Sequence, residues 1–346
     1  MFRKLSYVIV LILVGMGMAF GQTNVSGTWN GGDISDLVTI DQDLLYYKAT
    51  NSNGSVNVTI NNQNYTTYET AITAVYNALE NNATTTLNSN VTWNGGTVNN
   101  ISVVNLNGKT VTFYNARTVN STLVLVGDGT VNCWNGTYRG YFSLSGTMIL
   151  QGNVTLDGGG GNRNKALISG GGKLYMADNA TIQRCKNTSS SDFGGAVYLS
   201  GSSAKFYMVG GVIGHDGSES EVYMHPEEYT NTGVDYTDCA LVYSLVAANK
   251  NSAKRGGGIY LNSSATAYIN GGKIKGNEAT EAGNGDLRGG GGIFAMKSTV
   301  NMYGGEISYN LAIGGAGLNC NGGTVNISGG LFKWNCACLN EHYEAG

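Results

Sequence analysis

One pattern occurs four times in the second half of the chain and limits what this sequence can fold into. Each unit opens with glycines before an apolar residue, and a second glycine pair follows. In three units 11 or 12 residues separate that apolar residue from the second pair, whereas successive units start 62, 34 and 25 residues apart. A constant interior with variable linking segments is typical of a solenoid with loops on one side. The units begin at Gly194-Gly195-Ala196-Val197, Gly257-Gly258-Ile259, Gly291-Gly292-Ile293 and Gly315-Ala316-Gly317-Leu318.

Each unit of about 25 residues contains three short apolar segments separated by glycine or asparagine corners. Strands this short, joined by such corners, predict one coil of a parallel β-helix, and the fold class is all-β. Corner residues Asn277, Asn310 and Asn335 are expected to stack as a ladder of hydrogen-bonded amides. The upstream sequence fits the same plan, and we expect about nine coils in total. Its candidate strands are Val111–Phe113, Leu123–Val126, Phe142–Leu144, Met148–Leu150, Val154–Leu156 and Lys173–Met176.

Composition agrees with this fold and excludes several functions. The chain has 53 glycines in 346 residues, about twice the usual ~7%, and a single proline, Pro226. Collagen is excluded because there is no three-residue glycine period. Twenty Lys and Arg against 23 Asp and Glu give a net charge of −3, which argues against a nucleic-acid partner.

Residues 1–21 have the pattern of a secretory signal peptide. Arg3 and Lys4 precede an apolar run, and Ala19 and Gly21 place small residues before a cleavage site at Gln22. The alternative is an uncleaved membrane anchor, but the run is short for a span of about 20 residues. We expect cleavage near Gly21, export to the medium or cell surface, and a mature chain without a helical membrane anchor.

Residues 22–85 form an N-terminal segment that contains the best helix pattern, over residues 67–80. Thr66 and Glu69 have the spacing of a capping box. The helix is expected to cap the first coil of a β-helix spanning residues 86–346; the alternative is a surface helix of a small N-terminal domain. Its apolar residues, at helical spacing, are Ala71, Ile72, Val75, Ala78 and Leu79.

A large insertion spans about residues 215–255 and is rich in acidic residues. Polar insertions in a rigid scaffold often carry binding contacts, but we favour the interpretation as a solvated loop without a function. The candidates for binding a ligand or calcium are Glu227, Glu228, Asp235 and Asp238. Apart from calcium there, no cofactor is expected.

Signatures of catalysis are absent from the sequence. No serine has glycine at both −2 and +2, there are three histidines, and the expected strands contain few acids. Apart from the calcium candidates of the insertion, the sequence therefore predicts no catalytic, cofactor-binding or metal-binding residue. The alternative is a polysaccharide lyase or glycoside hydrolase of the β-helix type that uses Glu227 and Glu228 as its acids.

Six cysteines lie after the expected cleavage site: Cys133, Cys185, Cys239, Cys320, Cys336 and Cys338. The spacing of the last two is not the CxxC of a metal or redox site. We expect buried small residues, or one or two disulfides whose pairing the sequence leaves open.

The repeats resemble the passenger repeats of chlamydial polymorphic outer membrane proteins, which combine GGA[ILV] with FxxN. Gly194-Gly195-Ala196-Val197 matches the first motif, and Phe332-Lys333-Trp334-Asn335 matches the second. Ile replaces Phe in Ile274-Lys275-Gly276-Asn277 and Ile307-Ser308-Tyr309-Asn310.

The resemblance implies a right-handed parallel β-helix in a surface-exposed, adhesin-like bacterial protein. Its partner would be a ligand on a host or matrix surface, with carbohydrate as one candidate. The family's C-terminal membrane barrel has no counterpart here. Glu344-Ala345-Gly346 repeats Glu281-Ala282-Gly283, so we expect a fragment or truncated gene that ends within a repeat.

Overall fold

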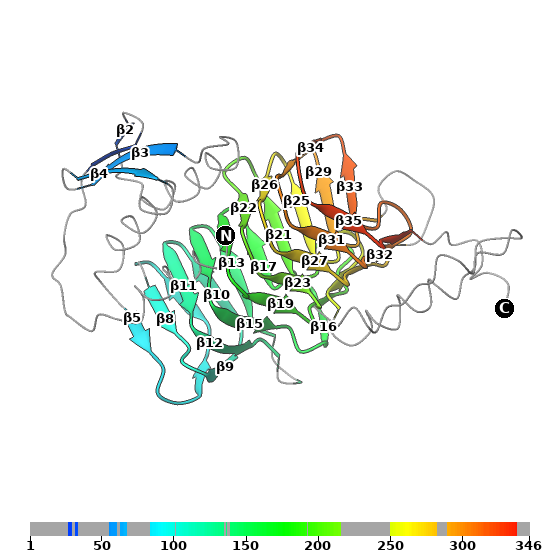
Figure 1. Cartoon of the computed structure of the whole chain (residues 1–346). Helices are drawn as coiled ribbons and strands as arrows, with labels where there is room; N and C mark the ends of the chain where they lie inside the picture. The colour runs from blue at the N-terminus through cyan, green and yellow to red at the C-terminus, as the bar shows by residue number, and fades with distance from the viewer. Residues whose placement is uncertain are drawn as a thin grey trace, which may run out of the picture.

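Short parallel strands stack in register from coil to coil in the computed structural model (Figure 1). The structure describes residues 27–29, 32–33, 55–60, 63–67 and 84–337, apart from 101, 135, 137–138, 192, 216–249 and 282–288. The four strands before the coils form an antiparallel sheet of order β2-β1-β3-β4. They are β1 (Gly27–Trp29), β2 (Gly32–Asp33), β3 (Ser55–Ile60) and β4 (Gln63–Thr67).

Three long parallel sheets form the faces of the coil; sheets 2 and 3 each have nine strands and sheet 1 has eight, because the first described coil begins at sheet 2. Sheet 1 contains β7 (Gly96–Val98), β10 (Ala116–Val119), β13 (Tyr141–Leu144), β17 (Ile168–Gly170), β21 (Val197–Ser200), β25 (Ile259–Asn262), β29 (Ile293–Met296) and β33 (Leu318–Asn321). Sheet 2 contains β5 (Thr84–Thr86), β8 (Ser102–Asn105), β11 (Thr122–Val126), β14 (Thr147–Leu150), β18 (Lys173–Met176), β22 (Lys205–Met208), β26 (Thr266–Ile269), β30 (Thr299–Met302) and β34 (Thr324–Ile327).

Sheet 3 follows sheet 2 in every coil. It contains β6 (Val91–Trp93), β9 (Lys109–Phe113), β12 (Asp128–Asn132), β15 (Asn153–Asp157), β19 (Thr181–Gln183), β23 (Val212–Gly214), β27 (Lys273–Lys275), β31 (Glu306–Ser308) and β35 (Leu331–Lys333). Sheets 2 and 3 each have nine strands, so the expected number of coils is correct, and the parallel β-helix is confirmed.

A fourth sheet of two-residue strands, sheet 4, was not expected from the sequence. Its strands lie after the corner that ends sheet 3, in six of the coils. They are β16 (Asn162–Arg163), β20 (Lys186–Asn187), β24 (Ser252–Ala253), β28 (Glu278–Ala279), β32 (Leu311–Ala312) and β36 (Cys336–Ala337).

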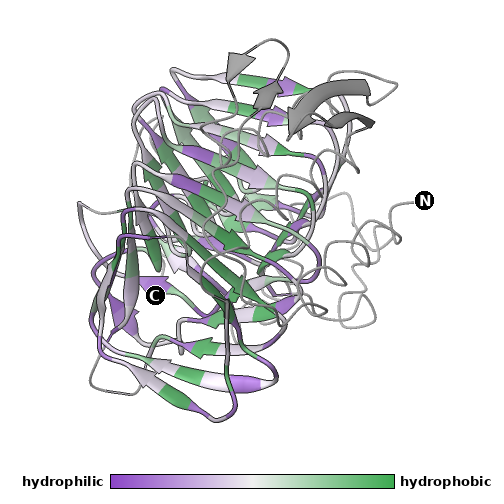
Figure 2. Cartoon of the chain, turned by 90° about the vertical axis from the view of Figure 1, so that its left-hand side faces the viewer, coloured by the Kyte–Doolittle hydropathy of each residue, from purple (hydrophilic) through white to green (hydrophobic). Residues whose placement is uncertain are grey.

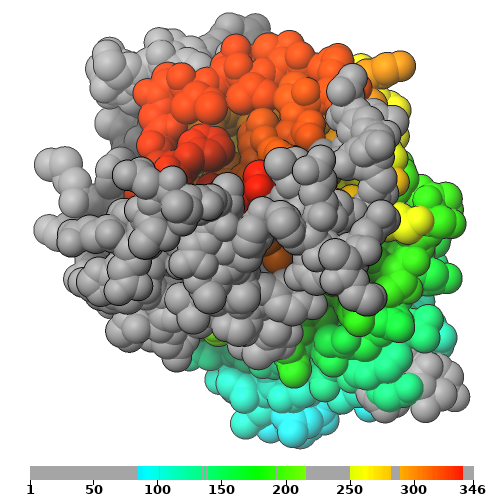
Figure 3. Space-filling view, turned by 90° about the vertical axis from the view of Figure 1, so that its right-hand side faces the viewer, coloured from blue at the N-terminus to red at the C-terminus, as the bar shows by residue number. Residues whose placement is uncertain are grey.

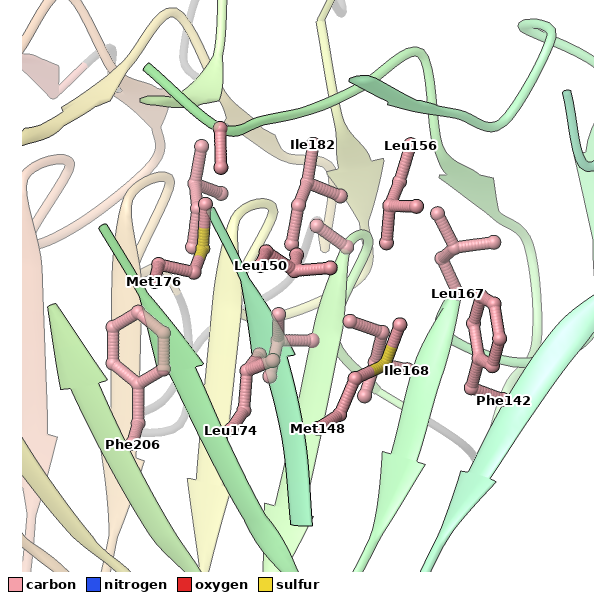
Figure 4. Packing of buried hydrophobic residues seen from close by; sticks show 14 of the residues in the cluster. Phe142, Met148, Leu150, Leu156, Leu167, Ile168, Leu174, Met176, Ile182 and Phe206 are labelled. Atoms are coloured by element: carbon pink, nitrogen blue, oxygen red, sulfur yellow. The ribbon is translucent and has the colours of Figure 1, made fainter. Parts of the chain in front are cut away.

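The core lies inside the coil, where alternate strand residues meet. Leu174 and Met176 of β18 are fully buried, and they align with Phe206 and Met208 of the next coil. Figure 4 shows Leu174, Met176 and Phe206 beside side chains of sheets 1 and 3, and all of them belong to one continuous apolar cluster. Viewed from one end, hydrophobic residues recur at the same strand positions through successive coils (Figure 2). Burying such side chains is the main stabilising contribution to a domain of this kind.

The corner after sheet 3 has a left-handed residue followed by an inward asparagine. Gly276, Tyr309 and Trp334 have φ of 65°, 53° and 49°, and Asn277, Asn310 and Asn335 follow them. The expected amide ladder is confirmed, because Asn277 Nδ2 donates to Asn310 Oδ1 at 2.9 Å and Asn310 Nδ2 to Asn335 Oδ1 at 2.9 Å.

The corner before sheet 1 requires glycine, because adjacent coils approach each other too closely there for a side chain. A Cβ on Gly195 would lie 2.0 Å from the carbonyl oxygen of Gly257 in the next coil. No side-chain rotation relieves that contact, because the backbone fixes the position of the Cβ and the atom that it meets is a backbone oxygen.

Several expectations fall on residues that the structure does not describe. Thr67, the first residue of the predicted helix 67–80, ends β4, and the remainder lies outside the described residues, as do the signal peptide and most of the insertion. The first coil strand, β5, starts at Thr84, two residues before the expected boundary at 86. The described residues contain no helix.

Candidate binding surface

The insertion leaves and rejoins the coil at one corner, between β23 of sheet 3 and β24 of sheet 4. The backbone N–H of His215 donates to the carbonyl of Lys275 at 2.9 Å at its start. At its end, Lys250 Nζ lies 2.7 Å from Glu278 Oε2. Asn251 then joins the ladder, since its Nδ2 donates to Asn277 Oδ1 at 3.0 Å. The stacked coils therefore fix both ends of the insertion.

The four acidic residues predicted from the sequence, Glu227, Glu228, Asp235 and Asp238, lie outside the described residues. Their role in binding a ligand or calcium stays a prediction. Within the part of the chain that the structure describes, no group of three or more His, Cys, Asp or Glu has the arrangement of a metal site.

Beside the end of the insertion, aromatic side chains and an ion pair form what we call the aromatic corner. It consists of Phe193, Tyr198, Arg255, Tyr260 and Glu281. The ring of Tyr260 stacks on Tyr198 with centroids 5.6 Å apart, and it packs against Phe193 at 5.0 Å. In the following coil, Phe294 continues the stack at 5.2 Å with an interplanar angle of 4°.

Arg255 connects the aromatic rings to the acidic residue. Its guanidinium carbon lies 4.7 Å from the centroid of Phe193, which is a cation–π geometry. Nη2 donates to Glu281 Oε1 at 2.9 Å, and Nε donates to the other carboxylate oxygen, so the pair is bidentate. The hydrogen bond to Glu281 raises the pKa of Arg255 above its ordinary value. Burial raises the pKa of the Tyr260 hydroxyl, which therefore stays protonated at neutral pH.

The corner leaves several of these groups partly accessible. Tyr260 is 3% exposed, whereas Phe193, Tyr198, Arg255 and Glu281 are each partly exposed. Asn262 Nδ2 donates to the Tyr198 hydroxyl at 3.4 Å. The aromatic corner thus combines rigid aromatic rings with a guanidinium and an amide. Groups of these kinds anchor ligands in binding sites and at protein interfaces.

Several carboxylates of the described coils have partners that hold the coil together. Asp157 accepts from Arg184 Nε and Nη2 at 2.8 and 2.6 Å, and Glu306 lies 3.5 Å from Lys333 Nζ. Asp128 accepts from Asn153 Nδ2 at 2.6 Å and belongs to a surface amide row. These contacts give each acid a structural role in joining adjacent coils.

Two cysteines occupy core positions, as the interpretation as buried small residues predicts. Cys133 and Cys185 are fully buried, and neither is in a disulfide. Burial raises the pKa of Cys185 to about 12 and raises that of Cys133 as well, so both thiols stay protonated at neutral pH. Cys239 and Cys338 lie outside the described residues.

The largest exposed apolar side chains lie in the last described coil. They are Ile327 (55%), Leu331 (47%), Phe332 (38%) and Trp334 (43%). Figure 3 views this end, with the last coils in orange and red.

Sequence reasoning missed the aromatic corner, although a signal for it exists. Tyr198, Tyr260 and Phe294 each lie two or three positions after a glycine pair, and the strand register aligns them across β21, β25 and β29. Comparing the outward positions of successive repeats, rather than their apolar pattern alone, would have located the stack. Arg255 and Glu281 are neighbours only because the coils stack.

Comparison of the chain with protein-family models, with curated proteins and with solved structures found no match. Among the described residues, none forms a helix long and apolar enough to cross a membrane.

Proposed function

We propose that this protein is a secreted or cell-surface β-helix that binds a partner without chemical turnover, in the manner of an adhesin. The aromatic corner is the observation that carries the proposal. It places partly exposed aromatic rings and a bidentate Arg255–Glu281 pair beside the fixed end of a long polar insertion. The sequence pattern of a signal peptide over residues 1–21 supports export, and the resemblance to outer membrane passenger repeats supports display on a cell surface.

The scaffold suits binding because the corner is held rigidly. Tyr260 is stacked between Tyr198 and Phe294, so the rings are ordered before a ligand arrives. A preordered site loses less conformational entropy on binding than a flexible one. The partner class is a ligand on a host or matrix surface, with carbohydrate as the first class to test, because sugars pack their apolar ring faces on aromatic side chains and bond their hydroxyls to planar polar groups.

Tyr198→Ala tests the proposal directly. Removing the exposed ring from the stack is expected to weaken binding about tenfold or more, the effect of losing roughly 1.4 kcal/mol of contact free energy. The measurement is binding of the purified protein to arrayed glycans and matrix proteins. Thr155→Ala, an outward position on sheet 3, is the matched control and should bind like the unmodified protein.

The same panel distinguishes binding from catalysis. Polysaccharides are incubated with the protein, with and without calcium, and released chain ends are quantified. The proposal predicts binding without released ends. Turnover that disappears in a Glu227→Gln, Glu228→Gln variant would contradict it and establish the lyase or hydrolase alternative.

A further inference from the structure

Positive charge gathers in the coils that precede the large insertion. Residues 84–214 contain nine Lys and Arg and four Asp, although the whole chain has 20 Lys and Arg against 23 Asp and Glu. A basic segment within an acidic chain indicates an anionic partner for that segment. Such a partner needs several of these cations on one surface, and the stacking of the coils decides whether they lie together.

Several cations lie along one edge of the coils, at or just before the start of the sheet 1 strands. Arg117 is the second residue of β10, Arg139 lies two residues before β13, and Lys165 lies three residues before β17. These three strands are adjacent in sheet 1 (Figure 1). Two coils further on, Arg255 lies at the same corner, where its carbonyl accepts from the backbone N–H of Gly194 at 3.0 Å. We call Arg117, Arg139, Lys165 and Arg255 the cationic edge.

Each member of the cationic edge lies against an aromatic ring. The quadrupole of a ring attracts a cation and so holds the charge in position without neutralising it. The distances from the guanidinium carbon or ammonium nitrogen to the ring centroid are 4.4 Å for Arg117 on Trp93, 5.2 Å for Arg139 on Trp134, 5.6 Å for Lys165 on Tyr141 and 4.7 Å for Arg255 on Phe193. The positive charges are therefore ordered before a ligand arrives.

Most of the cationic edge has no acidic partner. Within the part of the chain that the structure describes, Arg255 is the only member that contacts a carboxylate, that of Glu281. The Nε of Arg117 is buried without a hydrogen-bond partner, and this burial lowers the pKa of the guanidinium below its ordinary value, although it stays charged at neutral pH. Arg139 and Lys165 are exposed. An anionic ligand from outside the chain can therefore reach both of them.

We propose that the cationic edge binds a linear acidic polysaccharide, which lies along the coils and reaches the aromatic corner. The inference names the chemical class of the partner and rests on the proposed function. From β10 to β25 the edge crosses four strand spacings, about 19 Å at about 4.8 Å each. An extended chain with anionic groups on successive sugars can contact several of these cations at once, because guanidinium groups bind oxyanions in bidentate geometry. The aromatic corner at the end of the edge offers partly exposed rings to a sugar.

A single-stranded nucleic acid fits the edge less well. Proteins that bind single strands stack the bases on free aromatic faces, whereas rings of the cationic edge already have neighbours. Trp134 packs against the backbone of Gly159 and Gly161, where an added Cβ would lie 2.5 and 2.4 Å from atoms of its side chain, and it also holds Arg139. The edge therefore offers mainly positive charge, which suits a partner recognised by its anionic groups.

Binding to heparin measures the contribution of the cationic edge. An Arg139→Gln, Lys165→Gln protein should bind heparin at least about tenfold more weakly than the unmodified protein, because it loses two charge-assisted contacts. Lys109→Gln with Lys297→Gln is the matched control. It removes the same charge at the start of β9 and after β29, away from the edge, and should bind heparin like the unmodified protein. Thermal unfolding shows that both variants are folded, and equal losses of affinity in the two would overturn the proposal.

The choice of ligand separates this inference from the proposed function. Heparin is compared with the same polymer after its sulfates are removed and its carboxylates reduced, and with a single-stranded oligonucleotide. Heparin should bind most tightly, and its affinity should fall as salt is added, because salt screens exposed charges. Failure of heparin to bind, equal binding of the neutral polymer or tighter binding of the oligonucleotide would overturn the inference alone. Failure of every arrayed glycan and matrix protein to bind would overturn the proposed function as well.

Discussion

At the scale of single residues, the amide ladder is the most specific feature of the coil. Asn277 shows the full set of contacts: its Nδ2 donates to the carbonyl of Ile213 at 3.0 Å and to Asn310 Oδ1, and its own Oδ1 accepts from Asn251. The side chain is fully buried. A buried amide with every bond made stabilises the fold, whereas removing it leaves its neighbours without partners.

Asn277→Ala is therefore expected to lower the free energy of unfolding by about 2–4 kcal/mol, because it removes the amide that donates to the Ile213 carbonyl and the oxygen that accepts one of the Asn251 Nδ2 hydrogens in the interior. The measurement is urea unfolding followed by circular dichroism. Asn179→Ala is the matched control, since Asn179 makes its 2.9 Å bond to Asn153 on an exposed surface row. Its cost should stay below about 1 kcal/mol. Equal costs at the two positions would contradict the structural role of the inner ladder.

Three of the ladder residues could be predicted from the sequence, and two members could not. Asn277, Asn310 and Asn335 share the same place in adjacent repeats. Asn251 is separated from its repeat by the insertion, and the preceding rung is Cys185, whose backbone N–H donates to Asn251 Oδ1 at 2.9 Å. The cysteine at one ladder position and the long insertion before the next interrupt the repeat. The spacing between asparagines in the sequence therefore does not reveal these two positions.

At the scale of elements, the sequence repeat could predict where the strands lie, but it did not predict whether their outward side chains are buried. The upstream strands expected from the sequence coincide with β9, β11, β13, β14, β15 and β18. In β11 and β14 every residue is buried, so these strands are covered on both sides. A continuous apolar run such as Leu123–Val126 is the known signal for two-sided burial, and it could have predicted that the outer side of β11 is buried.

The close approach of adjacent coils at the corner glycines can be tested by substituting alanine. Gly195→Ala should destabilise the protein by about 1–3 kcal/mol, because the added Cβ meets the Gly257 carbonyl at 2.0 Å and forces adjacent coils apart. Gly171→Ala is the matched control: its Cβ would lie 3.3 Å from the Ser200 carbonyl oxygen, a contact that a small shift relieves. Thermal unfolding of both variants makes the comparison. A Gly195→Ala protein as stable as the Gly171→Ala protein would show that the coils are not packed this closely.

At the scale of the whole molecule, in-register stacking gives each group of residues its position. It aligns Tyr198, Tyr260 and Phe294 into one stack and gathers the outward apolar residues of sheet 2 into one face. The predicted ligand residues of the insertion lie outside the described residues, and the stacked coils fix the two ends of that insertion. The sequence could therefore predict the scaffold from its period, whereas the aromatic corner depends on which outward side chains the register brings together.

A distance between two coils tests this register most directly. Thr110 and Lys273 are 163 positions apart in the chain, but they belong to one outward row of sheet 3, five strand spacings apart. Spin labels at Thr110→Cys and Lys273→Cys, measured by pulsed electron paramagnetic resonance, should give a narrow distribution near about 24 Å, from five spacings of about 4.8 Å. A broad distribution, or one centred well beyond about 40 Å, would contradict the stacked β-helix on which the account rests.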